Sequence, residues 1–373
     1  MSQKTIVMKP IERFYFAILH KEADQVPLCF MVSPNDYCRI ASRKIYEIYN
    51  SKSPEIYLNA QLSWLKKYGR EVLHIPSVYP LLSFGAGNWA LPSAFGCEIS
   101  PPTENRLAVI KKTLIKTPDE IPNLAKEIQI PNLRKAGNCP EALKLLEYYN
   151  KNVPEEIKVE QPFTAENFTY IGGVLDTAAS ILGMHNILVG IYKYPDALHQ
   201  ILNIIKDSII EWIRIQEEIV GKIKKIVLTN HQIAFINPKY VKEFVIFYEQ
   251  AVLKYWNGAL KIFHGETDIR KNLGALAEFL KHCKIDVWHM SPQLDIGVAK
   301  NLFGDKVTLW GNIDTHEIAY GTPESIRKIC KNIIMKAASG GGFILGTGGG
   351  LDTNGKFENL DAVIEAVKKY GKY

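Results

Sequence analysis

The stretch of sequence that decides the fold is LKIFHGETDIRKNLGALAEFLKHCKIDVWHM, residues 260–290. It starts and ends with short apolar runs, 260–265 and 285–290, and such runs are typical of fully buried strands. Between them, 269–283 carries apolar residues at three- and four-residue spacing, which predicts an amphipathic helix. The stretch therefore predicts one strand–helix–strand unit of an α/β protein.

The same alternation extends over most of the chain. Six further apolar runs predict strands at 26–32, 72–77, 157–161, 225–230, 307–312 and 342–347. From residue 225 onward strands and helices alternate strictly, with further helices expected at 238–256, 293–303, 323–339 and 357–370. Eight strands with alternating helices favour a (β/α)8 TIM barrel over an open doubly wound sheet.

One segment departs from this regularity. Residues 78–156 are rich in Pro, Asn and Gly and predict an irregular insertion over the barrel mouth. No internal repeat or low-complexity linker is found, so we expect residues 1–373 to form a single domain.

Composition excludes several classes of function. The net charge of +6 is spread thinly, without the concentrated basic face that nucleic-acid binding needs. The six cysteines form no Cys-x-x-Cys pair, which argues against a zinc ribbon or a disulfide framework and favours a reducing compartment. No signal-peptide core or bilayer-length apolar run is found. We therefore expect a cytoplasmic protein that binds neither nucleic acid nor membrane.

Catalytic residues of such a barrel lie at the C-terminal ends of its strands. His264 and Glu266 end the run 260–265 and suit a metal ion or an acid/base pair. The alternative is a hydrogen-bonded rim histidine followed by a helix-capping glutamate. Glu243 is a candidate third metal ligand, although its place in a predicted helix equally indicates an exposed side chain.

Other polar residues follow other strands. Asn230, His231 and His289 are candidate catalytic residues, with capping or packing beside Trp288 as the structural alternatives. Candidate substrate-binding residues at further strand ends are Gln161, Asn312, Asp314, Thr347 and Gly349. Asn and Asp in such positions also commonly bond to local backbone.

The order of several segments resembles the uroporphyrinogen decarboxylase superfamily, and within it most closely the branch of cobalamin (corrinoid)-dependent methyltransferases. The segments are Gln161-Pro-Phe-Thr164, Asn237-Pro-Lys-Tyr-Val-Lys-Glu-Phe244, Ile262-Phe-His-Gly265, Leu309-Trp-Gly-Asn-Ile-Asp314, Gly321-Thr-Pro-Glu-Ser325, Gly342-Phe-Ile-Leu345 and Glu358-Asn-Leu-Asp-Ala-Val363. This resemblance implies a (β/α)8 barrel that moves a methyl group between a small substrate and the cobalt of a corrinoid on a separate carrier protein.

The resemblance also implies zinc in many members, bound by a His-x-Cys motif that matches His264 to Glu266 and by a cysteine in the last strand's glycine loop. This chain keeps His264 but has Glu266 and Gly349 at the two cysteine positions. Thiol activation is therefore not expected, and an oxygen-rich site of His264, Glu266 and Glu243 is the predicted form of a metal centre.

The features by which true uroporphyrinogen decarboxylases bind their substrate are missing. The arginine-rich segment after the first strand, the aspartate after the second and the histidine of the final glycine loop are replaced by Pro27-Leu-Cys-Phe-Met-Val-Ser-Pro34, His74-Ile-Pro-Ser-Val78 and Gly348-Gly-Gly-Leu351. A substrate with many carboxylates would meet no arginine clamp here.

The resemblance thus predicts a methyltransferase that acts between a small methylated compound and a corrinoid carrier protein, with Glu266 or His231 as proton donor or acceptor. The alternatives are a decarboxylase or lyase acting on a small carboxylated substrate, and a catalytically silent binding protein of the same fold.

Overall fold

The computed structural model describes residues 7–77, 89–103, 106–351 and 354–373. Its strands are β1 (Cys29–Val32), β2 (Leu73–Pro76), β3 (Glu98–Ser100), β4 (Val109–Lys112), β5 (Phe168–Gly172), β6 (Lys225–Thr229), β7 (Leu260–Gly265), β8 (Val287–Met290), β9 (Thr308–Ile313) and β10 (Phe343–Thr347). Its α-helices in the first half are α1 (Pro10–Ile18), α2 (Pro34–Ile40), α3 (Ile45–Ser51), α4 (Pro54–Tyr68), α5 (Ala90–Ala94), α6 (Ile121–Glu127), α7 (Cys139–Asn152), α8 (Glu155–Glu160), α9 (Val174–Leu182) and α10 (Met184–Lys193). Those of the second half are α11 (Pro195–Val220), α12 (Pro238–Val241), α13 (Phe247–Leu253), α14 (Leu273–His282), α15 (Ile296–Phe303), α16 (Thr315–Tyr320), α17 (Pro323–Ala337) and α18 (Phe357–Tyr370).

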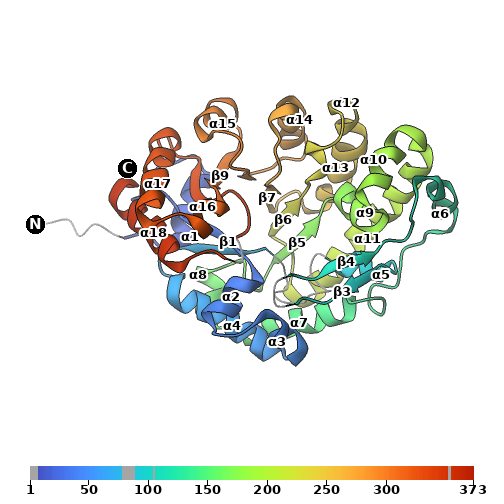
Figure 1. Cartoon of the computed structure of the whole chain (residues 1–373), viewed down its shortest axis with the longest axis horizontal. Coiled ribbons are helices and arrows are strands. Elements are labelled where there is room, and N and C mark those ends of the chain that lie inside the picture. Colours follow the sequence, from blue (N-terminus) through green and yellow to red (C-terminus); the bar gives the residue numbers. More distant parts are fainter. Residues whose placement is uncertain (1–6, 78–88, 104–105, 352–353) are drawn as a thin grey trace, which may run out of the picture.

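Eight of the strands are parallel and form the barrel (Figure 1). A continuous ladder runs from β5 through β10 in sequence order, and β1 pairs with β2. A parallel bridge between Leu28 and Leu345 joins β1 to β10. This architecture confirms the predicted (β/α)8 barrel class.

One predicted strand is wrong. Residues 157–161 belong to the surface helix α8, where Val159 is 69% exposed, and the third barrel strand is β5. The charged residues of α8 alternate with its apolar ones, so that a single amphipathic turn resembled a short strand. In β5, by contrast, Phe168 to Ile171 are all buried.

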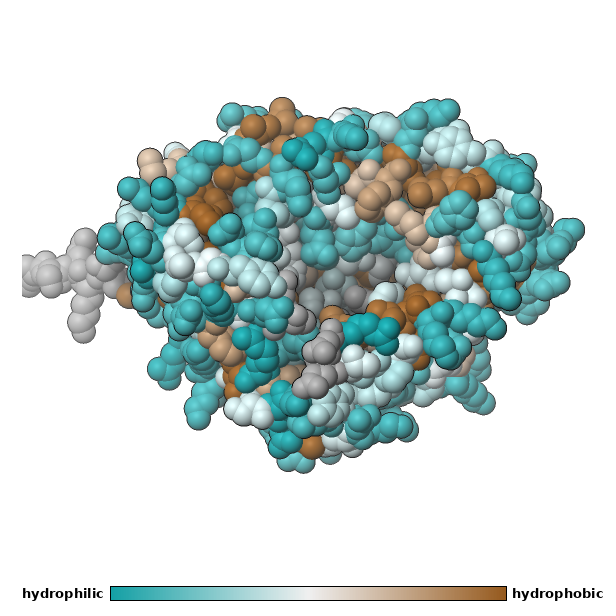
Figure 2. Space-filling model, in the orientation of Figure 1, coloured by the Kyte–Doolittle hydropathy of each residue, from teal (hydrophilic) through white to brown (hydrophobic). Residues whose placement is uncertain are grey.

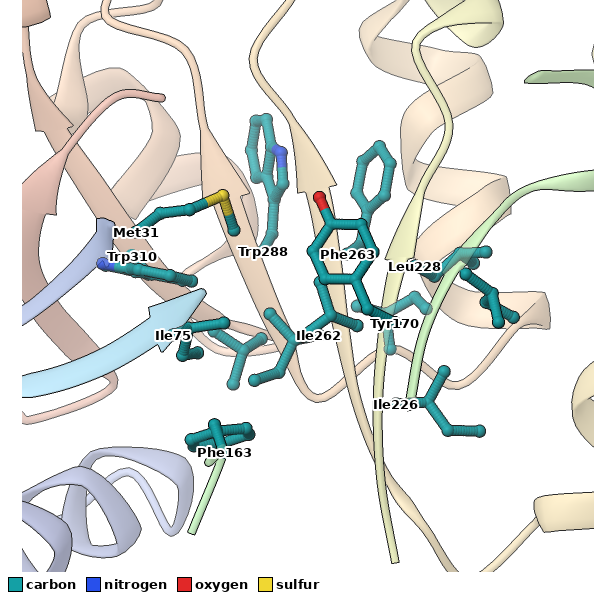
Figure 3. Packing of buried hydrophobic residues seen from close by; sticks show 14 of the residues in the cluster. Met31, Ile75, Phe163, Tyr170, Ile226, Leu228, Ile262, Phe263, Trp288 and Trp310 are labelled. Carbon is teal, nitrogen blue, oxygen red and sulfur yellow. The ribbon is translucent and has the colours of Figure 1, made fainter. Parts of the chain in front are cut away.

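Strand alternation divides the apolar side chains between the barrel interior and the helical layer. Phe263 and Trp288 pack outward, against Phe279 of α14 and Phe303 of α15 respectively. Ile262 occupies the alternate position of β7 and belongs to the buried cluster shown in Figure 3. The same alternation places His264 on the side of Ile262, away from the helices.

The insertion predicted at 78–156 is described from residue 89 onward, since residues 78–88 and 104–105 lie outside the described part. It contains α5, the antiparallel β3–β4 hairpin, α6, α7 and a 3-10 turn, η1 (Pro118–Glu120). Trp89 and Leu107 of this segment line a cavity at the barrel mouth. The segment therefore supplies part of the wall above the strand ends.

Among the described residues, no single helix is long and apolar enough to cross a membrane. The α9–α10 pair meets that test of length and composition only when the two helices are joined across a 110° bend.

Candidate metal centre and substrate cavity

A cavity of about 500 Å³ opens at the C-terminal ends of the barrel strands. It is lined by Met31, Ser33, Ser77, Trp89, Leu107, Tyr170, Gly172, Asp176, Thr177, Ala179, Ser180, Met184, Thr229, His231, Gln232, His264, Glu266, Gly350 and Leu351. Hydroxyl and apolar groups dominate, and neither Lys nor Arg occurs in this described lining. The face of the molecule in Figure 2 is largely hydrophilic and hollowed near its centre.

Three potential metal ligands converge in the cavity. His231 follows β6 directly, His264 lies in β7, and Glu266 follows β7. Each offers one ligand atom, and these atoms all lie within 4.8 Å of one another. Nε2 of His264 is 3.7 Å from Oε2 of Glu266, and Nε2 of His231 is 4.0 Å from Oε1.

The hydrogen bonds of Asp176 fix the orientation of His231. Asp176, in the first turn of α9, accepts from Nδ1 of His231 at 2.9 Å and from the backbone N–H groups of His231 and Gln232 at 2.9 and 3.0 Å. Because a carboxylate can only accept, the proton lies on Nδ1 of His231. Nε2 is buried and has no hydrogen-bond partner among the described residues, so its lone pair is free for a ligand.

Strand register places His264 beside a second buried histidine. His264 is paired in register with Thr229 of β6 and His289 of β8, so the three side chains share one face. Nδ1 of His264 lies 2.8 Å from Nδ1 of His289, and Nε2 of His289 lies 2.7 Å from the carbonyl oxygen of Thr347. The site is thus connected to the last barrel strand.

Burial determines the charge states of these histidines. Desolvation and the nearby His231 lower the pKa of His264 to about 3, and desolvation with the nearby His264 lowers the pKa of His289 to about 3. Burial alone would also lower the pKa of His231, but the hydrogen bond and charge of Asp176 outweigh it and raise that pKa. Neutral His264 is thus already in the state that metal binding requires.

The glycine loop after β10 makes room for Glu266. A β-carbon at Gly349 would lie 2.5 Å from Oε2 of Glu266, and the backbone N–H of Gly350 donates to the same oxygen at 3.4 Å. Gly349 therefore contributes space for the carboxylate and no ligand of its own.

Comparison with known proteins follows from this geometry. The family model for uroporphyrinogen decarboxylase (URO-D) matches residues 9–370. The chain belongs to the uroporphyrinogen decarboxylase family. It is 26% identical over 364 residues to the uroporphyrinogen decarboxylase of Hydrogenovibrio crunogenus, covering 95% of this chain and 96% of the relative. It is 23% identical over 371 residues to that of Coxiella burnetii, covering 96% and 95%.

A solved structure described as a methyltransferase from Methanosarcina mazei has the same fold. It superposes with a TM-score of 0.76 at 18% identity and covers 98% of this chain and 99% of its own. The fold of this family member is therefore shared with a methyltransferase as well as with the fold family of the decarboxylases.

Within this family frame, two predicted site residues lie away from the cavity. Asn230 is fully buried and donates to Oε1 of Glu249, which also accepts from the backbone N–H of Val174. Glu243 lies on the outer helical layer, in the π-helical turn η3 (Lys242–Ile246), and pairs with Nε2 of His199 at 2.9 Å. The structure thus replaces Glu243 by His231 as the third member of the candidate metal group.

The predicted substrate-binding residues mostly support the backbone. The side chain of Gln161 accepts from the N–H of His74 and donates to the carbonyls of Val72 and Gly69, which satisfies the free edge of β2. Asn312 donates to the carbonyls of Ser291 and Leu294.

Two further candidates also have local roles. Asp314 caps α16 by accepting from the N–H of His316, and Thr347 donates its hydroxyl to the carbonyl of Gly349. Neither these four side chains nor Gly349 appears in the described lining, although Thr347 reaches the site through its carbonyl.

Asp176 is the residue that sequence reasoning missed. Because the third strand was assigned to 157–161, the residues that follow β5 were not examined as a strand end. The signal was present in the buried run Phe168-Thr-Tyr-Ile-Gly172, followed by Gly173 and a helix with an acidic first turn. The same error hid Tyr170, Thr177 and Ser180, which line the cavity.

Proposed function

We propose that this family member is a metal-dependent methyltransferase that moves a methyl group between a small methylated compound and a corrinoid on a separate carrier protein. The observation that carries the proposal is the convergence of His231, His264 and Glu266 in the cavity. The side-chain types of this group, the hydroxyl-rich cavity and the resemblance to corrinoid-dependent methyltransferases support it together.

The residues fit a metal ion. Two imidazole nitrogens and one carboxylate oxygen form a ligand set typical of catalytic zinc, which keeps a further position open for substrate. The buried, unpartnered Nε2 of His231 is an independent sign of a ligand at this point. Zinc held here would act as a Lewis acid on the heteroatom that carries the methyl group.

The protein's own residues would position the substrate. Asp176 holds His231 with its lone pair toward the cavity. Ser33, Ser77 and Ser180 offer hydroxyl groups, and Met31 and Trp89 offer apolar surface, for a compound small enough to occupy about 500 Å³. The shape and polarity of the lining therefore suit a small, weakly polar methyl donor or acceptor.

The electrostatics of the lining favour methyl transfer over decarboxylation of a polycarboxylate. Asp176 and Glu266 are acidic, and the described lining offers no cation to bind a row of carboxylates. Decarboxylation remains the competing activity because the sequence relatives carry that name.

The decisive experiment uses zinc-loaded protein with free cob(I)alamin as the corrinoid probe and a panel of methanol, methyl ethers, methyl thioethers and methylamines. Methylation of cobalt changes its absorption spectrum, and we expect one class of compound to cause this change. The His264→Ala variant is the control and should abolish it. Release of CO2 from uroporphyrinogen, without a cobalt change from any methylated compound, would overturn the proposal in favour of the decarboxylase.

A further inference from the structure

A chain of three groups connects the last barrel strand to the candidate metal ligand His264. The carbonyl of Thr347 meets Nε2 of His289 at 2.7 Å, and Nδ1 of His289 meets Nδ1 of His264 at 2.8 Å. His289 is 1% exposed and His264 is 5% exposed, so bulk water does not compete for these bonds.

The direction of each hydrogen bond follows from the acceptor at the end of the chain. A carbonyl oxygen can only accept, so Nε2 of His289 carries a proton. Nδ1 of the neutral His289 ring is then an acceptor, and the proton between the two rings belongs to Nδ1 of His264. Nε2 of His264 is left unprotonated on the side that faces Glu266.

The ring of His289 is itself held firmly. It stacks on Trp310 with a centroid distance of 3.7 Å and an interplanar angle of 19°. Trp310 in turn donates its indole N–H to the carbonyl of Cys29 at 2.9 Å. Stacking and register together leave His289 little freedom to turn away from His264.

We propose that His289 is a positioning residue that fixes His264 in the tautomer with a free Nε2, and so sets the affinity of the metal centre. The proposal rests on the proposed function for its metal, but the tautomer itself is a property of the metal-free protein. A partner of this kind orients a ligating histidine and raises its basicity, and its loss typically costs 10- to 100-fold in metal affinity.

Two substitutions separate the hydrogen bond from the packing. His289→Phe keeps an aromatic ring against Trp310 but removes the acceptor for Nδ1 of His264. His289→Asn places an amide oxygen near the former Nδ1 and keeps that acceptor while losing the stacking. We expect zinc affinity, measured by competition with a chromogenic chelator, to fall about 10- to 100-fold in His289→Phe and much less in His289→Asn.

The tautomer is measured in metal-free wild-type protein by long-range ¹H–¹⁵N correlation of ¹⁵N-histidine-labelled samples. We expect His264 to be protonated at Nδ1 and His289 at Nε2. A His264 ring protonated at Nε2 overturns the proposal, even if His289→Phe fails to fold. Equal zinc affinity in folded wild type and His289→Phe also overturns it. If wild type binds no zinc, the proposed function fails while the NMR result still decides the role of His289.

Discussion

Gly349 leaves room for the carboxylate of Glu266, because a β-carbon at this glycine would lie 2.5 Å from Oε2. The glutamate and the glycine occupy the two places where the resembled methyltransferases have cysteines. The longer carboxylate fills space that any side chain at position 349 would contest. The two positions therefore form a matched pair, and a change at one should be felt at the other.

We predict that Gly349→Ala displaces the carboxylate of Glu266 and lowers zinc affinity about tenfold or more, since a ligand would be moved. Gly350→Ala is a matched control in the same loop, because its β-carbon would meet only Cβ of Ser77, at 3.7 Å. Chelator competition on both variants tests this, and equal affinities would show that Glu266 does not depend on Gly349.

Asp176→Ala should lower zinc affinity about 10- to 100-fold, because Nδ1 of His231 would lose its carboxylate partner. Asp314→Ala removes another aspartate at the start of a helix and serves as the control. It should cost roughly 1 kcal/mol of stability through the lost cap of α16 and leave zinc binding unchanged. Zinc loss in Asp314→Ala alone would instead support the original prediction of a site role for Asp314.

Glu249 should make stability depend on pH. Burial raises the pKa of its carboxyl to about 8 from an ordinary value of 4.5. In this range the folded state holds the proton more tightly than the unfolded state, so stability is full below about pH 4.5 and is lost as pH rises toward 8. We expect a loss on the order of a few kcal/mol, measured by urea unfolding at pH 5 and pH 9.

Glu249→Gln mimics the protonated acid, since its amide oxygen can still accept from Val174 and Asn230. The free-energy difference between this variant and wild type should therefore grow with pH. Glu211→Gln, at an exposed position of α11, should give no such trend. A pH-independent difference between Glu249→Gln and wild type would contradict the raised pKa of Glu249.

Gln161→Ala should destabilise the barrel without weakening zinc binding. The variant leaves the N–H of His74 and the carbonyl of Val72 unpaired in a buried region, at roughly 1 to 3 kcal/mol for each group. Gln293→Ala at an exposed position should stay within about 0.5 kcal/mol of wild type. Unchanged stability of Gln161→Ala, together with weaker substrate binding, would return Gln161 to the cavity.

The local pattern of apolar residues was sufficient for the barrel. Seven of the eight predicted strands lie where strands are found, because buried parallel strands are short continuous apolar runs. The failure at 157–161 has the same origin, since one amphipathic turn of α8 and a short strand cannot be separated by periodicity alone. That single error also concealed Asp176.

The sequence by itself determined the fold class and placed His231, His264 and Glu266 at strand ends, because those features depend on local periodicity. Tertiary structure decided how these residues act. The register of β7 and β8 sets His289 against His264, α9 brings Asp176 to His231, and the loop after β10 leaves space for Glu266. These contacts join segments far apart in the chain, and hydrogen-bond direction is defined only once both partners are in place.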